Sequence, residues 1–295
     1  MADHEEAVQA LCRQHKELDP EALILRLCRE LLDEYPTDSG PTPLRVLGSI
    51  RCIRDIRYGP IATTSGCSGL LAVEDGGYVV TLAEGEPSGR QHRSLAHEIL
   101  HTLFRDVHPG PAGREEERLC ELGAAELTMP AARVTQFMDR RGPVGFDVVN
   151  EVAQEFGVTT DAAARRLVEL SSEPMCYFVA CMMRTKKQNE FDLGRPLLRI
   201  ASWRLSPSWR DQRPLRGLAV ESNSLIGQAF LAQDFQAGNG PAEISHRDGV
   251  FYIEAAGYTF PQHGKARSQV AVLMRASEGK EVGGRQPKGR REPRA

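Results

Sequence analysis

The sequence predicts an α+β fold, in which a mostly helical N-terminal part with a small β-sheet is followed by a strand-rich C-terminal part. Apolar residues recur at helical spacing through much of residues 5–172, whereas short β-favouring runs dominate residues 176–274. The length agrees with this division, because a chain of 295 residues more often holds two domains than one.

The first elements are expected to be two helices within residues 5–35, the second opened by Asp19 and Pro20. Proline suits the first position of a helix, and aspartate suits the position before it. A loop rich in Pro, Gly, Ser and Thr follows. A helix is then predicted near residues 44–51 and a strand near residues 53–58.

Two β-favouring runs, residues 69–73 and 78–82, flank the turn sequence 74–77 and predict a hairpin. The exposed edge of this hairpin could receive a substrate peptide as an additional strand. The alternative is that the hairpin only packs beneath the helix that follows it. The sequence favours neither.

Residues 94–104 carry the most specific signal in the chain, His97-Glu98-x-x-His101, within a run of helical apolar spacing. Residues four apart lie one turn above each other on a helix, so both histidines can direct ring nitrogens at one metal ion. Glu98 lies one step further round and can take a proton from a water held there. The motif therefore indicates a zinc site with a general base, against the alternative of a chance spacing.

A catalytic zinc site takes a third protein ligand and leaves one position open. The helix-compatible run 114–130, stopped by Pro130, places Glu117 and Glu121 four apart on a face with small side chains. Glu117 as the ligand, with Glu121 steadying a zinc-bound histidine through its ring N–H, would complete the site. The alternative is a solvated acidic first turn, and Glu115 and Glu116 are expected to contribute little.

These motifs resemble the ImmA/IrrE family of metallo-endopeptidases, in which L-A-H-E-x-x-H is followed by E-x-x-[AC]-[ND]-x-F-A-A-E-L-L-M-P. The matching stretches here are residues 95–101 and 117–130, and a looser resemblance extends over residues 1–175. The resemblance implies a minimal-zincin peptidase core. It also implies the zinc ligands His97, His101 and Glu117, with Glu98 as the general base.

Three positions depart from the family pattern. Glu121 stands where Asn or Asp is usual, Gly123 where Phe is usual, and Arg93 where Phe is common. The departures concern the surroundings of the metal ligands, because all three ligands and the general base are present.

Composition limits the classes of function. The net charge is −3 and the pI about 6.3, which gives no electrostatic case for wrapping nucleic acid or an anionic membrane. The seven cysteines are scattered without a C-x-x-C pair, a pattern typical of a reducing compartment. With no signal-peptide pattern at the N-terminus and no apolar run of about eighteen residues, a cytoplasmic protein without a membrane span is expected.

Residues 145–172 predict two helices around a turn at residues 157–160, a helix-turn-helix-like arrangement. Only Arg165 and Arg166 are basic on the second helix. Because two arginines are few for reading a DNA groove, a structural or partner-docking role is favoured over DNA binding. The ImmA/IrrE resemblance implies a similar helical region after the peptidase core.

The C-terminal part is expected to form a small α+β domain. Its predicted elements are strands at 176–183, 197–205, 250–258 and 270–274, with a helix near 224–232. Some relatives of IrrE type carry a GAF-like sensing domain at this place, and His246 and His263 stand apart from any ligand cluster. A sensing or recognition role is therefore predicted here.

The predicted domains are residues 1–140 for the peptidase, 141–174 for the helix-turn-helix-like segment, 175–276 for the C-terminal domain and 277–295 for a disordered basic tail.

The predicted function is zinc-dependent hydrolysis of a peptide bond in a protein substrate. By resemblance, that substrate is a helix-turn-helix transcriptional repressor in a stress-response or mobile-element switch. Two alternatives are a DNA-binding regulator with a structural zinc and a catalytically silent module that binds a repressor or antitoxin. The presence of Glu98 argues against a catalytically silent protein, because a structural zinc site needs no general base. His92, His108 and Tyr78 are candidates for stabilising the oxyanion.

Overall fold

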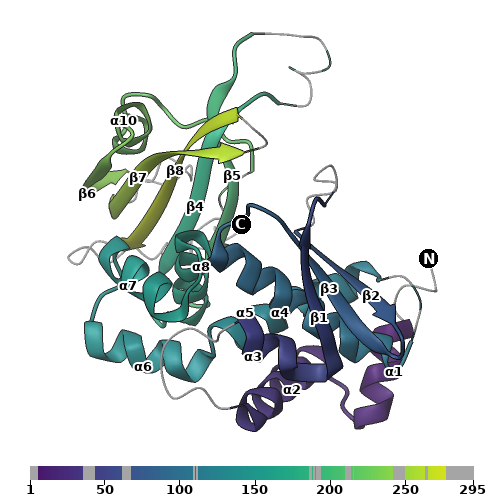
Figure 1. The fold of residues 1–295 in the computed structure, drawn as a ribbon. Coiled ribbons are helices and arrows are strands. Elements are labelled where there is room, and N and C mark those ends of the chain that lie inside the picture. The colour runs from purple at the N-terminus through teal and green to yellow at the C-terminus, as the bar shows by residue number, and fades with distance from the viewer. Residues whose placement is uncertain are drawn as a thin grey trace, which may run out of the picture. The chain divides into compact units, whose positions relative to one another are not determined.

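The computed structural model divides the chain into two compact units, Met1–Leu170 and Ser171–Ala295 (Figure 1). The structure describes residues 6–35, 44–61, 68–108, 110, 112–185, 188, 190, 194–209, 214, 216–241, 250–262 and 265–276. Both units combine helices with a β-sheet, so the predicted α+β class is confirmed. Within those ranges, no helix is both long enough and apolar enough to cross a bilayer.

Some predictions fall elsewhere in the chain. The loop at 36–43, the basic tail at 277–295, and the isolated His246 and His263 lie outside the described residues.

The first unit begins with helices where the sequence predicts them. They are α1 (Glu6–His15), α2 (Pro20–Glu34) and α3 (Leu44–Ser49), followed by the 3-10 turn η1 (Ile50–Cys52). Asp19 caps α2, since its carboxylate accepts hydrogen bonds from the amides of Glu21 and Ala22 at 3.0 and 3.3 Å. Such a cap satisfies amides that have no partner inside the helix.

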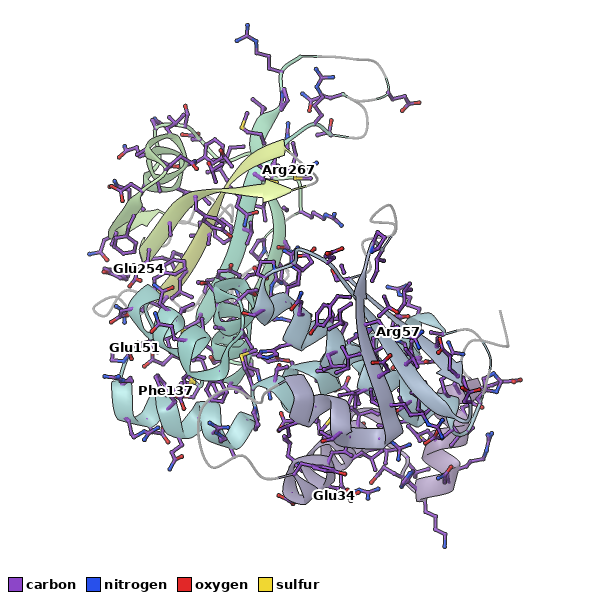
Figure 2. All side chains as sticks on the ribbon, viewed as in Figure 1. Glu34, Arg57, Phe137, Glu151, Glu254 and Arg267 are labelled. Atoms are coloured by element: carbon purple, nitrogen blue, oxygen red, sulfur yellow. The ribbon has the colours of Figure 1, made fainter. Side chains whose placement is uncertain are left out.

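A three-stranded sheet follows, with the strands in the order β1-β3-β2. The strands are β1 (Ile53–Gly59), β2 (Gly69–Glu74) and β3 (Gly77–Ala83). The predicted hairpin is confirmed as β2–β3, and its turn places Asp75 and Gly76 at φ values of +47° and +76°. β1 adds to β3 in parallel. Arg57 of β1, labelled in Figure 2, donates two hydrogen bonds of 2.8 and 2.7 Å to the carboxylate of Glu74.

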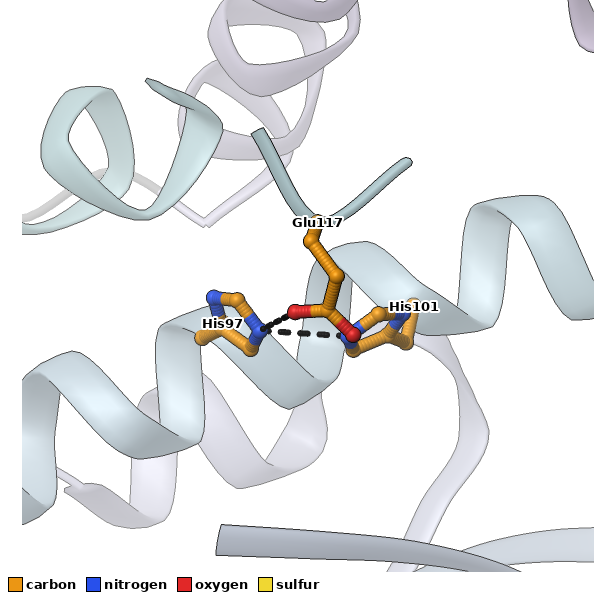
Figure 3. A group of neighbouring side chains, drawn as sticks. All are labelled: His97, His101 and Glu117. Atoms are coloured by element: carbon orange, nitrogen blue, oxygen red, sulfur yellow. Dashed lines mark hydrogen bonds and ion pairs between the residues drawn. The ribbon is translucent and has the colours of Figure 1, made fainter. Parts of the chain in front are cut away.

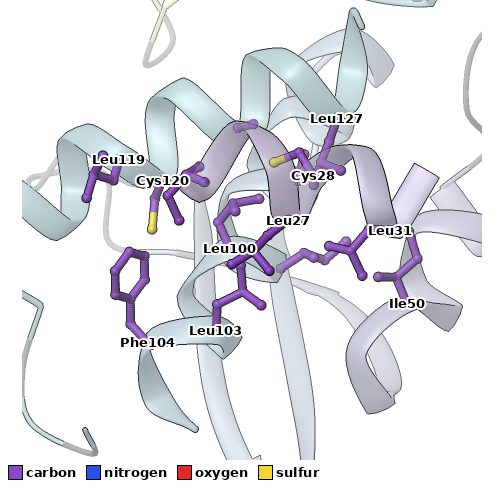
Figure 4. Close-up of a cluster of buried hydrophobic side chains, with 14 of the residues drawn as sticks. Leu27, Cys28, Leu31, Ile50, Leu100, Leu103, Phe104, Leu119, Cys120 and Leu127 are labelled. Carbon is purple, nitrogen blue, oxygen red and sulfur yellow. The ribbon is translucent and has the colours of Figure 1, made fainter. Parts of the chain in front are cut away.

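The core of the first unit lies where α4 (Ser88–Arg105) and α5 (Arg114–Thr128) pack against each other and against α2. Figure 4 shows the contributing side chains, which include Leu27 and Leu31 of α2, Leu100, Leu103 and Phe104 of α4, and Leu119 and Leu127 of α5. Burying such a side chain stabilises the fold by about 1.5–3 kcal/mol. This core fixes the spacing of the two helices that carry the predicted metal ligands.

Gly123 explains how closely these helices approach. A Cβ at this position would lie 2.8 Å from Leu100 and 2.9 Å from Ile24. Any larger side chain would push α5 away from both neighbours, so the glycine is required by close packing.

Three more helices complete the first unit: α6 (Ala131–Arg141), α7 (Phe146–Phe156) and α8 (Thr160–Leu170). The sequence predicts α7 and α8 but not α6. Of the residues of α6, which the structure describes throughout, only Val134 is buried, so the helix contributes little to the core. Residues 141–170 lie in the first compact unit. The predicted domain boundary at residue 140 stays a prediction.

The second unit contains an antiparallel sheet of five strands in the order β5-β4-β8-β7-β6, and α10 packs against β6, β7 and β8. The elements are β4 (Met175–Met183), β5 (Leu197–Leu205), α10 (Leu225–Ala232), β6 (Phe235–Pro241), β7 (Val250–Gln262) and β8 (Lys265–Ala276). β6 is the strand that the sequence does not predict. Gly238, Gly240 and Pro241 make it read as a turn, although it pairs with β7.

Candidate metal centre

Helix α4 brings His97 and His101 together as its geometry predicts, and α5 adds Glu117 (Figure 3). The Nε2 atoms of the two histidines are 3.1 Å apart. Glu117 places Oε2 at 3.2 Å from His97 Nε2 and Oε1 at 3.6 Å from His101 Nε2. Three donors from two helices therefore converge on one point.

The donor set fits a tetrahedral metal ion. Bonds of roughly 2.0–2.1 Å from an ion to two nitrogens and an oxygen imply donor separations of about 3.3 Å. Here the two nitrogens are 3.1 Å apart, and Glu117 places Oε2 at 3.2 Å from one of them and Oε1 at 3.6 Å from the other. Two neutral imidazoles and a carboxylate are also the ligand chemistry of catalytic zinc sites that keep a fourth position open.

Glu98 lies beside this cluster without being one of its three converging donors. Its side chain is largely buried, and burial raises the pKa of its carboxyl to about 7. Glu117 acts in the same direction, while His101 and Arg105 oppose it. A bound dication would favour the charged form. A carboxylate that gains and loses a proton near neutrality suits a general base.

The two histidines differ in their surroundings. Burial and the neighbouring His101 lower the pKa of His97. Burial also acts to lower the pKa of His101, but the hydrogen bond to Glu116 and the nearby carboxylates outweigh it and raise that pKa overall. His101 is thus the ring whose orientation is fixed by an acidic partner.

That partner, Glu116, corrects the expectation of a solvated acidic first turn. Glu116 is 2% exposed, and its Oε1 lies 2.8 Å from His101 Nδ1. A carboxylate oxygen here accepts the Nδ1–H and leaves Nε2 free to bind a metal. Glu115 does lie near the surface, where it pairs with Arg118. The expectation was wrong for Glu116 because one helical step carries it from the solvent to the interface with α4.

Replacing Glu116 by alanine should weaken metal affinity by roughly ten- to a hundredfold, the usual effect of removing a group that orients a metal-bound histidine. Metal titration of the folded variants measures this, with Glu115→Ala as the matched control. Glu116→Gln should retain part of the affinity, because its amide oxygen still accepts the Nδ1–H. Equal affinities for Glu116→Ala and Glu115→Ala would contradict the role.

Glu121 lies near the other histidine but does not bond it. Its Oε1 is 3.8 Å from His97 Nδ1, while its Oε2 forms an ion pair with Arg93. His97 Nδ1 has no hydrogen-bond partner in the part of the chain that the structure describes. The role of Glu121 in steadying His97 therefore stays a prediction.

Cys120 completes a second cluster with His101 and Glu116, and its Sγ lies 3.5 Å from His101 Nδ1. Burial raises the pKa of this thiol well above its usual range, and the nearby carboxylates add to the effect. Because a metal ligand would have to be the thiolate, the cluster is better understood as the packed surroundings of His101.

Two candidates for stabilising the oxyanion have other partners. The Tyr78 hydroxyl donates to Asp106 at 2.6 Å, and His92 Nδ1 lies 3.0 Å from the Gly157 carbonyl oxygen. His108 lies against Gly110, since a Cβ on Gly110 would be 2.5 Å from the His108 ring. A role for any of the three side chains in stabilising the oxyanion stays a prediction.

Comparisons with known proteins agree with this geometry. The IrrE N-terminal-like domain of peptidase family M78 matches residues 63–168. Radiation response metalloprotease IrrE of Deinococcus deserti is 33% identical over 112 residues, which cover 34% of this chain and 40% of that protein. The protein of the same name from Deinococcus radiodurans is 25% identical over 170 residues, covering 53% of this chain and 50% of that protein.

Residues 63–168 are therefore an IrrE N-terminal-like domain, similar to the corresponding part of the ImmA/IrrE metalloproteases. The matched parts span at most half the length of these curated relatives. A solved structure of a Mycobacterium tuberculosis transcriptional regulator is similar in fold, with a TM-score of 0.59 and 11% identity, covering 92% of this chain and 81% of that one.

The three departures from the family pattern can now be located in the structure. Arg93 and Glu121, both unusual at their positions, form an ion pair with each other across α4 and α5. Gly123 fills the place of a phenylalanine because Leu100 and Ile24 occupy the space that a side chain would need.

Proposed function

We propose that this protein is a zinc-dependent endopeptidase. The observation that carries the proposal is the convergence of His97, His101 and Glu117 on one point, with the buried Glu98 beside it. When bound, zinc would make a water more acidic and polarise the scissile carbonyl. The two histidines and Glu117 would hold the ion.

The remaining chemistry belongs to Glu98. Its carboxylate takes a proton from the attacking water and passes it to the leaving amine, so one group serves as base and then as acid. Peptide hydrolysis needs both transfers. The burial that raises the pKa of Glu98 also excludes bulk water, which would otherwise compete for the proton.

The substrate is proposed to pair with β2, which has β3 as its strand partner on one side and no strand on the other among the described residues. β2 begins at Gly69, where a Cβ would lie 2.9 Å from Glu98 Oε1. A peptide added along this edge would therefore pass the general base. The exposed Leu70 and Val73 on the same strand offer apolar contacts for its side chains.

Gly69→Ala should displace the carboxylate of Glu98 and lower turnover by about ten- to a hundredfold, since small displacements of a catalytic group have effects of this order. Metal content should not change. Gly59→Ala is the matched control, because its Cβ would approach nothing closer than Thr81 at 3.9 Å. Single-turnover cleavage and elemental analysis measure the two quantities, and undiminished turnover in Gly69→Ala would refute the placement of Glu98.

The proposed substrate is a helix-turn-helix repressor whose cleavage activates stress-response or mobile-element genes. The similarity to the ImmA/IrrE metalloproteases supports this choice, and the names of the relatives refer to a radiation response. The structural neighbour is named a transcriptional regulator, which suits a place in gene control.

Co-expression with the products of neighbouring genes tests the whole proposal. We expect one of them to be cleaved by the wild-type protein, cleavage to stop on chelation, and zinc to restore it. Cleavage that persists in the chelated protein would contradict a metallopeptidase.

The alternative of a DNA-binding regulator is disfavoured by the basic side chains of α8. Arg166 is buried in an ion pair with Glu126, and Arg165 pairs with Asp161 on the same helix. On the neighbouring helix α6, Arg141 pairs with Glu151 of α7 at 2.8 Å (Figure 2). Arginines already held by carboxylates are not available for phosphates or bases.

The second unit is proposed to sense or recognise, as a GAF-like domain would. Both clusters of potential metal ligands among the described residues belong to the first unit. Removing residues after Ser172 should therefore leave metal affinity within about twofold of the full chain while altering substrate choice or control. Metal titration and cleavage assays on the truncated chain test this. Loss of metal binding in a fragment that circular dichroism shows to be folded would contradict this division of roles.

A further inference from the structure

Helices α4 and α5, which carry the metal ligands, run antiparallel. Their contacts show this, because Arg93 meets Glu121, while His101, further along α4, meets Glu116, which comes earlier on α5. The chain joins the pair directly at one end, from Arg105 to Arg114. At the other end nothing covalent holds the helices at a fixed separation, although Glu117 must stay within bonding reach of both histidines.

The free end of α5 is tied to α8 through Glu126. One carboxylate oxygen accepts a hydrogen bond from Arg166 Nη2, and the other accepts the Ala131 amide at 3.2 Å. Arg166 Nε also donates to the Met129 carbonyl at 3.1 Å. The side chains of Glu126 and Arg166 are 6% and 4% exposed, so these directional bonds act in a low-dielectric interior.

The free end of α4 is tied to the turn between α7 and α8. His92 Nδ1 lies 3.0 Å from the Gly157 carbonyl oxygen, and because a carbonyl only accepts, Nδ1 carries the proton. Gly89 allows the contact, since a Cβ there would lie 2.7 Å from the Val158 carbonyl carbon. The turn therefore rests directly against the backbone of α4.

We propose that α7 and α8 act as a clamp on the metal centre, with His92, Glu126 and Arg166 as positioning residues. The clamp closes the open end of the α4–α5 pair and adds to the core in maintaining the distance between the two histidines and Glu117. In this proposal the helix-turn-helix-like pair α7–α8 supports the metal centre, and its buried Arg166 binds the carboxylate of Glu126. The inference rests on the proposed function, because it assigns these residues to the same metal site.

Zinc affinity of the full-length, folded protein tests the clamp at α4. His92→Ala should weaken zinc binding by about tenfold, because the free end of α4 loses its tie to the turn. His92→Asn is the conservative counterpart, since the side-chain amide can donate to the Gly157 carbonyl from nearly the same place. It should bind zinc within about threefold of wild type. A partly buried histidine that only supported the fold would not produce this difference.

At α5, a single replacement would leave a buried charge without its partner and could unfold the chain. The double variant Glu126→Leu/Arg166→Met removes both charges and keeps apolar volume, so it should fold. It should still bind zinc about tenfold or more weakly, because the bonds to Met129 and Ala131 are lost. Arg165→Met is the matched control, because Arg165 is next along the helix and pairs with Asp161 of the same helix; it should behave as wild type.

The measurement is competition of the metal-free proteins with a chelator of known zinc affinity, with circular dichroism to verify folding. When His92→Ala is combined with the double variant, the loss of zinc-binding free energy should be smaller than the sum of the two separate losses. Both sets of bonds act on the same separation between α4 and α5, so their effects should not be additive. Affinities within twofold of wild type in both folded variants would overturn the clamp. A wild-type protein that binds zinc but cleaves no protein would refute the proposed function alone, and one that binds no divalent metal would refute both.

Discussion

Glu98→Gln should leave the metal bound and reduce turnover by about two to four orders of magnitude, the usual contribution of general acid–base catalysis. Glutamine has the size of glutamate but cannot accept the proton of the attacking water. Glu98 lies outside the three converging donors, so its charge is not needed to hold the ion. Single-turnover cleavage and elemental analysis of the same preparation measure both quantities.

The structure adds a check on folding. Glu98 is largely buried, and its pKa is raised by burial, so a neutral amide should fit the site without loss of stability. Thermal unfolding of the variant should therefore match wild type. Full activity in Glu98→Gln would exclude this glutamate as the base, and loss of the metal would make it a ligand.

Much of the fold follows from local signals in the sequence. The hairpin β2–β3 is predicted by the turn residues Asp75 and Gly76, which take the positive φ values that such turns need. Helix α2 is predicted by its cap at Asp19. These features depend on residues that are close in sequence, so they can be predicted without knowledge of the tertiary structure.

Elements without a local signal were missed. β6 contains two glycines and a proline and is a strand because β7 pairs with it. α6 has one buried residue, Val134, and is opened by Pro130. For β6 the pairing with a distant strand decides the structure, and propensity alone cannot supply it.

The metal centre also has one part that local sequence predicts and one part that depends on tertiary packing. His97 and His101 were predicted correctly as neighbours because one helix fixes their relation. Which glutamates meet them depends on how α5 lies against α4. In an antiparallel pair, His101 lies beyond His97 and must meet residues earlier on α5, which selects Glu116. The sequence does not give the antiparallel direction in which α5 packs on α4, so it did not predict the contact of Glu116 with His101.

The pairing of Arg93 with Glu121 illustrates the same limit. Each residue departs from the family pattern, and the sequence shows them 28 positions apart with no reason to connect them. Only the packed helices reveal that the two departures form one ion pair.

Glu117→Ala should nearly abolish zinc binding, with a loss of more than roughly a hundredfold, which exceeds the effect of removing a group that only orients a ligand. Its two oxygens lie 3.2 and 3.6 Å from the Nε2 atoms of His97 and His101, so one of three protein donors would disappear. The Glu117 side chain is 52% exposed, and the apoprotein should therefore lose little stability. Zinc should raise the unfolding temperature of wild type and not that of the variant, because only a bound ligand stabilises the fold.

Four of the five glutamates on α5 make this experiment decisive, because each of the four has a different expected result. Zinc affinity should fall most for Glu117→Ala and by about ten- to a hundredfold for Glu116→Ala, which frees the His101 ring. Glu115→Ala should have little effect, since its carboxylate pairs with Arg118 near the surface. Glu121→Ala distinguishes two roles: a fall of tenfold or more means that it steadies His97, and no change means that it serves only Arg93. If Glu121→Ala abolished binding and Glu117→Ala left it intact, the third ligand would lie one helical turn further along α5.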